Sequence, residues 1–204
     1  MTNRHAPLLW GAILWFAAAL LLAARGVFVS GPNELPLVLA LAFLVPLVLF
    51  VLALLLSAGL RALVVSIPPV FLISLNGWRF IGLGFLMAYA EGMLPGGFAW
   101  PAGLGDIVMA VTAPWVVARV AADDGFRFST TFLAWNLFGI ADFLDAVLLG
   151  MLYLWPGFTA GTNTALMQRL PFALIPSFFV PLVAMAHFTL LAQRRSRLQG
   201  SPGA

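Results

Sequence analysis

Three ionisable residues, Arg79, Asp142 and Asp145, lie deep inside stretches of the sequence that are otherwise apolar. An ionisable side chain at membrane depth costs about 2.5–3.5 kcal/mol, so residues of this kind commonly serve a function. Asp142 and Asp145 are three positions apart and therefore share one face of a helix. Arg79 and Asp142 fall at matching depths in their stretches, which predicts an ion pair between two helices.

The charges of this predicted centre do not balance. Arginine keeps its proton in proteins, so one aspartate serves as its counter-ion and the other, Asp145, has no basic partner at that depth. We therefore expect Asp145 to hold a proton or to bind a cation, as carboxylates do in proton relays and cation-coupled carriers. Asn76 and Asn136 complete the polar centre. A purely structural pair that fixes helix packing is a second interpretation, and both remain open.

The segment 91–105 is rich in glycine and proline, which predicts irregular backbone. At membrane depth such backbone must be buried in protein or line a watery cavity. One interpretation is a re-entrant segment that lines an outer vestibule with Glu91 and Asp106 at its rim. The other is an ordinary loop followed by a capped helix.

His187 is expected near the cytoplasmic end of the last apolar stretch, either hydrogen-bonded or gating a proton exit. The only other histidine is His5, near the N-terminus, and cysteine is absent. Haem ligation and a zinc site are therefore not expected. Nucleotide-binding and hydrolase motifs are also missing, so we predict no cofactor, no metal and no catalytic residue.

The elements that must position these residues are membrane-spanning helices. The chain is 63% hydrophobic and 8% charged, with a mean hydropathy of +1.06, whereas soluble domains carry roughly 25% charged residues. A span needs about 20 apolar residues, so 204 residues accommodate about six. We predict an all-α polytopic membrane protein with a single domain over 1–193 and a basic tail over 194–204. The expected spans are 8–25, 37–57, 68–90, 104–120, 129–153 and 170–192.

The arginines predict the orientation of these spans. With both termini in the cytoplasm, two arginines, Arg25 and Arg169, lie outside, and seven lie inside: Arg4, Arg61, Arg119, Arg127, Arg194, Arg195 and Arg197. This distribution follows the positive-inside rule. The net charge of +3 is thus explained by topology, and nucleic-acid binding is not expected.

Three strings, Phe98–Asp106, Trp135–Asp142 and Pro171–His187, resemble segments of uncharacterised bacterial multi-pass membrane proteins. The resemblance covers about 90–190 and carries no assigned activity. It implies a location in the bacterial inner membrane.

The leading functional hypothesis is a small carrier or conducting protein for a proton, a cation or a small solute, working through the Arg79 centre. The alternative is a scaffold or accessory subunit whose buried pair only fixes assembly. A membrane-embedded enzyme acting on lipids, with Asp106, Asp142 and Asp145 around a divalent cation, is a third class. The expected partners are the lipid bilayer and the transported species, and a homo-oligomer fits the small number of helices.

Overall fold

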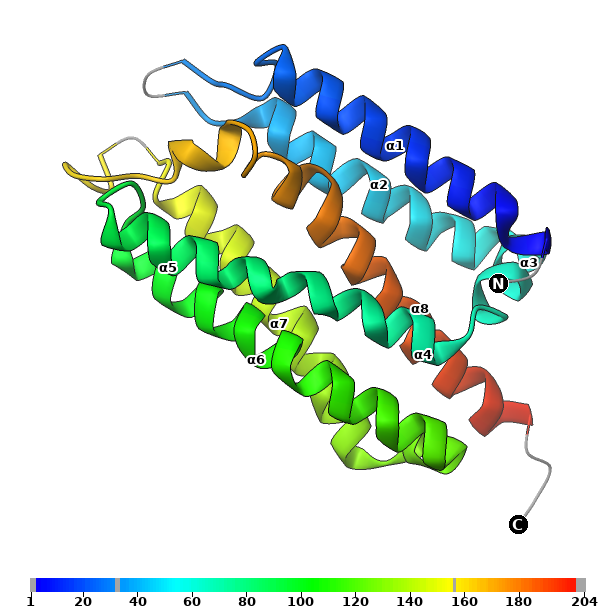
Figure 1. The fold of residues 1–204 in the computed structure, drawn as a ribbon. Helices are drawn as coiled ribbons and strands as arrows, with labels where there is room; N and C mark the ends of the chain where they lie inside the picture. Colours follow the sequence, from blue (N-terminus) through cyan, green and yellow to red (C-terminus); the bar gives the residue numbers. More distant parts are fainter. Residues whose placement is uncertain (1–2, 32–33, 156, 201–204) are drawn as a thin grey trace.

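The computed structural model describes residues 3–31, 34–155 and 157–200, which form a bundle of helices lying side by side (Figure 1). Six helical segments within these residues are long and apolar enough to cross a membrane. The prediction of an all-α membrane protein with about six spans is therefore confirmed. The segments are Ala6–Ala24, Leu37–Leu56, Pro69–Ala90, Gly96–Ala122, Thr130–Leu152 and Ile175–Ser196.

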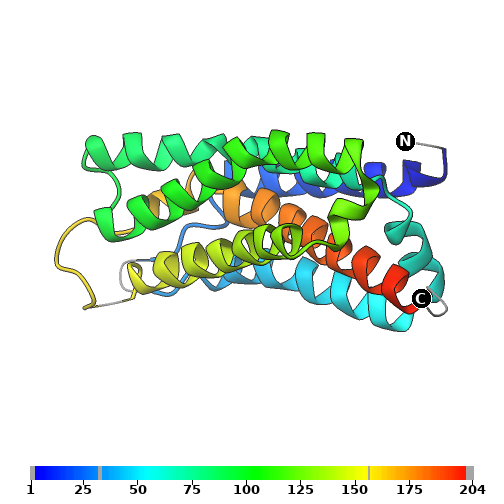
Figure 2. The same cartoon turned by 90° about the horizontal axis from the view of Figure 1, so that it is seen from below.

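The first two spans, α1 (Ala6–Ala24) and α2 (Leu37–Leu56), lie on the same side of the bundle in Figure 1, and Figure 2 shows that the last span lies between them. Most of their side chains face away from the protein, as expected for helices whose solvent is lipid. A short helix, α3 (Ala58–Val65), then leads to the third span. Ser57 caps it, because its hydroxyl oxygen accepts a hydrogen bond from the backbone N–H of Leu60 at 3.2 Å.

The third span consists of three pieces: α4 (Pro69–Ser74), a 3-10 helix (Leu75–Ile81) and α5 (Gly82–Ala90). A 3-10 helix has three residues per turn, so side chains three positions apart stack above one another. Asn76 and Arg79 have this spacing, and both are fully buried. The tighter winding thus directs both polar side chains into the bundle.

The fourth span, α6 (Gly96–Ala122), corrects the prediction for the glycine- and proline-rich segment. We expected irregular backbone to residue 105, but regular helix begins at Gly96 and only Glu91–Pro95 forms a turn. Pro95 immediately precedes the first helical residue, where a missing N–H is harmless. Lipid offers no water to satisfy free backbone groups, so the helix persists through Pro101 and the glycines.

These glycines form a contact surface between helices instead of a loop. A Cβ atom on Gly82 would overlap the backbone carbonyl of Gly103, so α5 and α6 approach each other closely here. A Cβ on Gly97 would overlap the hydroxyl group of Tyr153 in the same way. Small residues commonly allow such close packing in membranes, where dispersion contacts help to hold helices together.

A 3-10 turn (Asp124–Phe128) connects α6 to α7 (Thr130–Leu152). The capping chemistry expected at the start of α7 is present, since the Ser129 hydroxyl oxygen accepts from the backbone N–H of Phe132 at 3.1 Å. After α7 the chain forms a 3-10 turn (Ala165–Gln168) at the end of the bundle away from the termini.

The last span begins with a π-helical turn (Ile175–Phe179) and continues as α8 (Val180–Gly200). It is the central element: 61% of the residues in its most apolar 18-residue stretch are buried, against 6% for α2. Because α8 runs to Gly200, Arg194 and Arg195 of the predicted basic tail are helical; residues 201–204 lie outside the described part of the chain. The two ends of the chain lie at the same end of the bundle (Figures 1 and 2).

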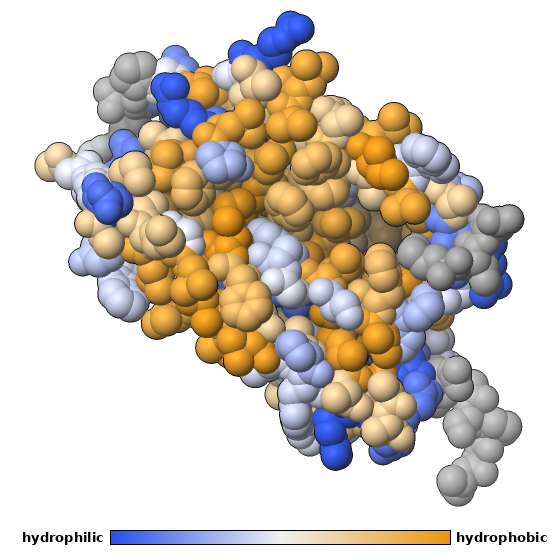
Figure 3. All heavy atoms as spheres, viewed as in Figure 1, coloured by the Kyte–Doolittle hydropathy of each residue, from blue (hydrophilic) through white to orange (hydrophobic). Residues whose placement is uncertain are grey.

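The surface agrees with a membrane location. The face seen in Figure 3 is mostly apolar along the helices, and strongly hydrophilic residues gather towards its two ends. Exposed leucines such as Leu14, Leu49 and Leu148 occupy the helix faces that point outward. An apolar band between polar ends is what a lipid bilayer requires.

The close contact of α5 and α6 predicts that alanine substitution changes stability differently at two nearby glycines. Gly82→Ala should destabilise the protein by about 1–3 kcal/mol, because its methyl group overlaps rigid backbone. Gly84→Ala meets only ordinary contacts, the nearest at 3.6 Å, and should be neutral or stabilising. The free energy of unfolding, from SDS titration of the detergent-solubilised variants, measures both. Equal stability of the two variants would contradict the close approach.

Candidate functional site

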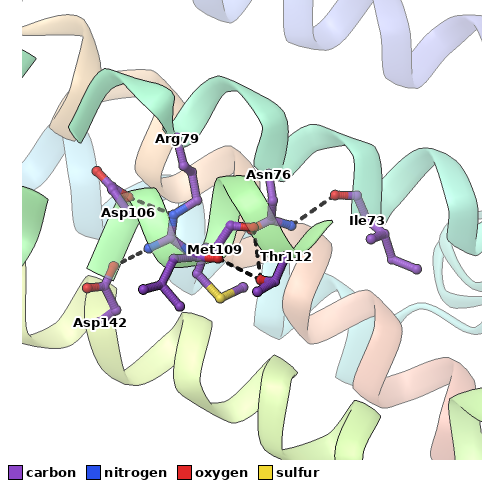
Figure 4. Close-up of polar contacts among 8 residues, drawn as sticks. Ile73, Asn76, Arg79, Asp106, Met109, Thr112 and Asp142 are labelled. Carbon is purple, nitrogen blue, oxygen red and sulfur yellow. Dashed lines mark hydrogen bonds and ion pairs between the residues drawn. The ribbon is translucent and has the colours of Figure 1, made fainter. Parts of the chain in front are cut away.

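The centre of the bundle holds one arginine between two aspartates that come from different helices (Figure 4). Arg79 donates from Nε to Oδ1 of Asp106 on α6 at 2.6 Å, and from Nη2 to Oδ2 of Asp142 on α7. The predicted pair of Arg79 and Asp142 is confirmed. This cluster of Arg79, Asp106 and Asp142 is called the charge triad below.

The charge triad is withdrawn from the surface. Arg79 is completely buried, and Asp106 and Asp142 are 5% and 8% exposed. The guanidinium carbon of Arg79 also lies 4.0 Å from the centre of the Phe143 ring, within the range of a cation–π interaction. Coulomb attraction is strong in such a low-dielectric setting, so the three side chains should hold one another firmly.

The second acid of the polar centre is Asp106, which pairs with Arg79, and not Asp145, which we expected there from the sequence without a basic partner. Asp145 is exposed on the outer surface of α7, although Asp142 lies only three positions away. Asp106 was expected at the rim of an outer vestibule, at the start of a helix. Since α6 begins at Gly96, Asp106 instead lies about 15 Å into the helix.

Glycine makes room for the carboxylate of Asp142. A Cβ atom on Gly105 would overlap Oδ1 of Asp142, so that oxygen packs directly on the backbone of α6. The residue preceding Asp106 therefore has to be small for Asp142 to reach Arg79. On α6, Asp106 thus supplies a charge to the triad, and the neighbouring Gly105 leaves room for the Asp142 carboxylate.

A second polar pair lies next to the charge triad. The side-chain oxygen of Asn136 is hydrogen-bonded to Nδ1 of fully buried His187, and Nδ2 of Asn136 donates to the His187 carbonyl at 3.3 Å. An amide oxygen only accepts, so the proton of a neutral His187 lies on Nδ1 and Nε2 is left as an acceptor. The Phe143 ring contacts Arg79 and lies 6.2 Å from the His187 ring, which places the pair beside the triad.

Several predicted positions are corrected by this arrangement. His187 is hydrogen-bonded, which was one of its two expected roles, and it packs against Gly139, one turn of α7 from Asp142. Asn136 binds His187 and not Arg79. Asn76 is buried beside Arg79, yet its amide donates to the carbonyl of Ile73 at 3.2 Å.

The outer vestibule of Glu91 and Asp106 is not formed. Glu91 is exposed in the turn after α5, whereas Asp106 is inside the bundle. The reason is the helical conformation of 96–105, which carries Asp106 away from the turn. No three His, Cys, Asp or Glu side chains gather to hold a metal ion in the part of the chain that the structure describes.

Sequence reasoning missed a cavity of about 170 Å³ beside the charge triad. Its walls come from α2, α5, α6, α7 and the segment from Met167 to Val180 that leads into α8, and Asp106 is the only charged residue among them. The wall residues on and just after α7 extend from Phe143 to Leu154, so the cavity reaches from the depth of the triad towards the end of the bundle away from the termini. No periodicity of a single helix encodes this space, since it forms between five segments.

Four buried polar atoms near the triad lack a hydrogen-bond partner among the described residues: Asn76 Oδ1, Trp78 Nε1, Arg79 Nη1 and His187 Nε2. Unpaired buried groups are rare in folded proteins and commonly mark a bound water or ion, or a catalytic role. Three of the four belong to the 3-10 helix, so the unmet hydrogen-bonding capacity concentrates where the charge triad is built.

Comparison with known families places the chain in one of them. A family model described as a domain of unknown function, DUF8737, matches residues 5–194. The chain belongs to this family. The match spans all six membrane-spanning segments except the final residues of the last, so DUF8737 corresponds to the bundle itself. No curated protein and no solved structure matches the chain.

The geometry of this DUF8737 protein predicts unequal effects on stability. Arg79→Met leaves two buried carboxylates without a counter-charge and should cost roughly 3–5 kcal/mol. Asp106→Asn leaves one cation facing one anion, and its amide oxygen can still accept from Arg79, so the cost should be about 1 kcal/mol. SDS unfolding titrations measure both. Asp145→Asn is the matched control and should remain within about 0.5 kcal/mol of wild type.

Proposed function

We propose that this protein is a small proton-binding carrier of the membrane, with Asp106 as the group that takes up and releases the proton. The observation that carries the proposal is the sharing of one arginine by two buried aspartates, one of which lines a cavity. Among carriers for a proton, a cation or a small solute, the proposal selects the carrier of a proton, because the proton suits the triad best.

The charge balance of the triad supports proton binding. Arg79 stays protonated, so two ionised aspartates would leave one negative charge in a largely dehydrated bundle. Leaving that charge uncompensated costs several kcal/mol, and a bound proton or cation removes the cost. Asp106 is the favoured carrier of the proton because it lines the cavity, whereas Asp142 packs against Gly105.

The unpaired polar atoms would extend the proton path from the triad towards the end of the bundle that holds the termini. The third span enters from the end of the bundle that holds the termini, so Asn76 precedes Arg79 on that side. His187 Nε2 is available as an acceptor in the same region, beside Gly139. Ordered water bridging such atoms would provide a path for a proton between the triad and that end.

Location and orientation complete the proposal. We place the protein in a bacterial inner membrane, as implied by the resemblance of its sequence, with both termini in the cytoplasm, as favoured by the arginine distribution. In this orientation the cavity opens on the outer half of the membrane. Asp106 would then exchange its proton with the outer side through the cavity.

A second candidate function is favoured by Asp145. An exposed carboxylate about 10 Å from the end of α7 lies within the apolar band, where a charge is costly. A second copy of the chain packed on this face of α7 would shield it from lipid. The protein would then serve as an assembling subunit, with the charge triad fixing the fold of each copy.

Proton flux tests the first function. Purified protein in liposomes loaded with a pH-sensitive dye, with valinomycin and potassium to balance charge, should dissipate an imposed pH gradient faster than protein-free liposomes. Asp106→Asn should reduce the rate to that of protein-free liposomes, because the proton-binding oxygen is lost. Asp145→Asn is the control and should keep the wild-type rate. A wild-type rate in the Asp106→Asn variant would refute the proposed role.

Disulfide cross-linking tests the second function, because the chain contains no cysteine of its own. Leu148→Cys introduces a thiol on the exposed face of α7, one turn from Asp145. If two copies pack on this face, oxidation in native membranes should give a cross-linked dimer. Leu83→Cys, also exposed but on α5, should stay monomeric. Equal cross-linking of both variants would indicate random collision and rule out an α7 interface.

A further inference from the structure

We propose that the cavity beside Asp106 binds a small lipid-soluble amine, which enters from the bilayer between α2 and α7 and pairs its ammonium group with Asp106. This inference rests on the proposed role of Asp106 as the proton-binding group and names the substrate class of the same site.

The size of the cavity limits the ligand. A volume of about 170 Å³ is close to that of an engineered 150 Å³ protein cavity that binds benzene, so one aromatic ring or a short alkyl chain fills it. Phe85, Phe98 and Phe143 contribute rings to its wall, and the other walls are also apolar. The body of the ligand must therefore be apolar, as in most small-molecule sites.

The single charged group of the wall determines the polar end of the ligand. Asp106 uses Oδ1 to accept from Arg79, and its other oxygen points away from Arg79 in Figure 4. An ionised carboxylate only accepts hydrogen bonds, so the ligand must supply a donor. A cationic donor also cancels the excess negative charge of the charge triad, which a neutral alcohol cannot do.

The walls indicate the route of entry. Ala40 and Phe43 on α2 and Ala146, Val147 and Met151 on α7 line the cavity, and all five are only partly buried. The cavity is therefore partly open between these two helices, on a surface that faces lipid. A molecule that reaches it from the bilayer must dissolve in lipid. An amine does so in its neutral form and becomes charged by taking the proton of Asp106.

This proton transfer links the inference to the proposed function. The amine nitrogen accepts the proton held by Asp106, and the resulting ammonium and carboxylate form an ion pair next to Arg79. No other reactant is required, because one N–H bond forms as one O–H bond breaks. Release of the ammonium from the site would carry the proton with it.

Calorimetric titration of the detergent-solubilised protein with benzylamine tests the inference, with benzyl alcohol as a neutral probe of almost the same shape. The wild type should bind the amine at least about tenfold more tightly than the alcohol, since a charge-assisted contact replaces a neutral one. Asp106→Asn should remove this preference while keeping the weak binding of benzyl alcohol. Equal affinities of the wild type for the two probes would overturn the inference.

Cavity-filling variants locate the binding. Ala146→Phe on α7 should abolish the binding of both probes, whereas Leu148→Phe, two positions away on the lipid-facing side, should bind them as the wild type does. Ala40→Phe fills the cavity from α2 and gives an independent result if Ala146→Phe does not fold. Unchanged binding in a folded cavity-filled variant would place the ligand elsewhere and refute the inference.

The two proposals can fail separately. Selective benzylamine binding without proton flux that depends on Asp106 would leave an amine-binding protein and remove the carrier. Flux that depends on Asp106, without a preference for the amine, would keep the proton carrier and overturn the substrate class.

Discussion

The structure of this protein depends on the need of one buried arginine for negative partners. Arg79 is fully buried in a bundle whose solvent is lipid, so its charge has to be met by side chains of neighbouring helices. Asp106 and Asp142 meet it from two different helices and thereby fix the relative positions of the third, fourth and fifth spans. Because lipid drives helices together only weakly, a contact of this kind also specifies which faces meet.

Small residues allow this electrostatic arrangement to coexist with close packing. Gly82 and Gly103 let the third and fourth spans approach, Gly105 receives the Asp142 carboxylate, and Gly139 receives His187. In each case the missing side chain is replaced by the polar group or backbone of another helix. These four glycines therefore serve the interior of the bundle, where polar groups have to be accommodated without disrupting the packing.

The charge triad, the Asn136–His187 pair and the cavity form one continuous region. Asp106 belongs to both the triad and the cavity wall, and Phe143 contacts Arg79, faces His187 and lines the cavity as well. An apolar space that ends on an unbalanced charge is suited to a ligand with an apolar body and a cationic end. The proposed proton binding and the proposed amine binding thus rest on the same excess negative charge.

The sequence by itself determined the membrane location, the six apolar spans and the pairing of Arg79 with Asp142, because hydropathy and charge cost act locally along the chain. It also indicated that one negative charge would remain unmatched. Only the tertiary structure decided that the second acid of the polar centre is Asp106 and not Asp145. Two acids three residues apart on a helix can still point in different directions, and here Asp142 faces the interior whereas Asp145 is exposed. The same holds for the helical conformation of 96–105, for the partner of His187 and for the cavity. Each depends on contacts between helices that lie far apart in the sequence, and the pattern within one helix does not specify which neighbour it will meet.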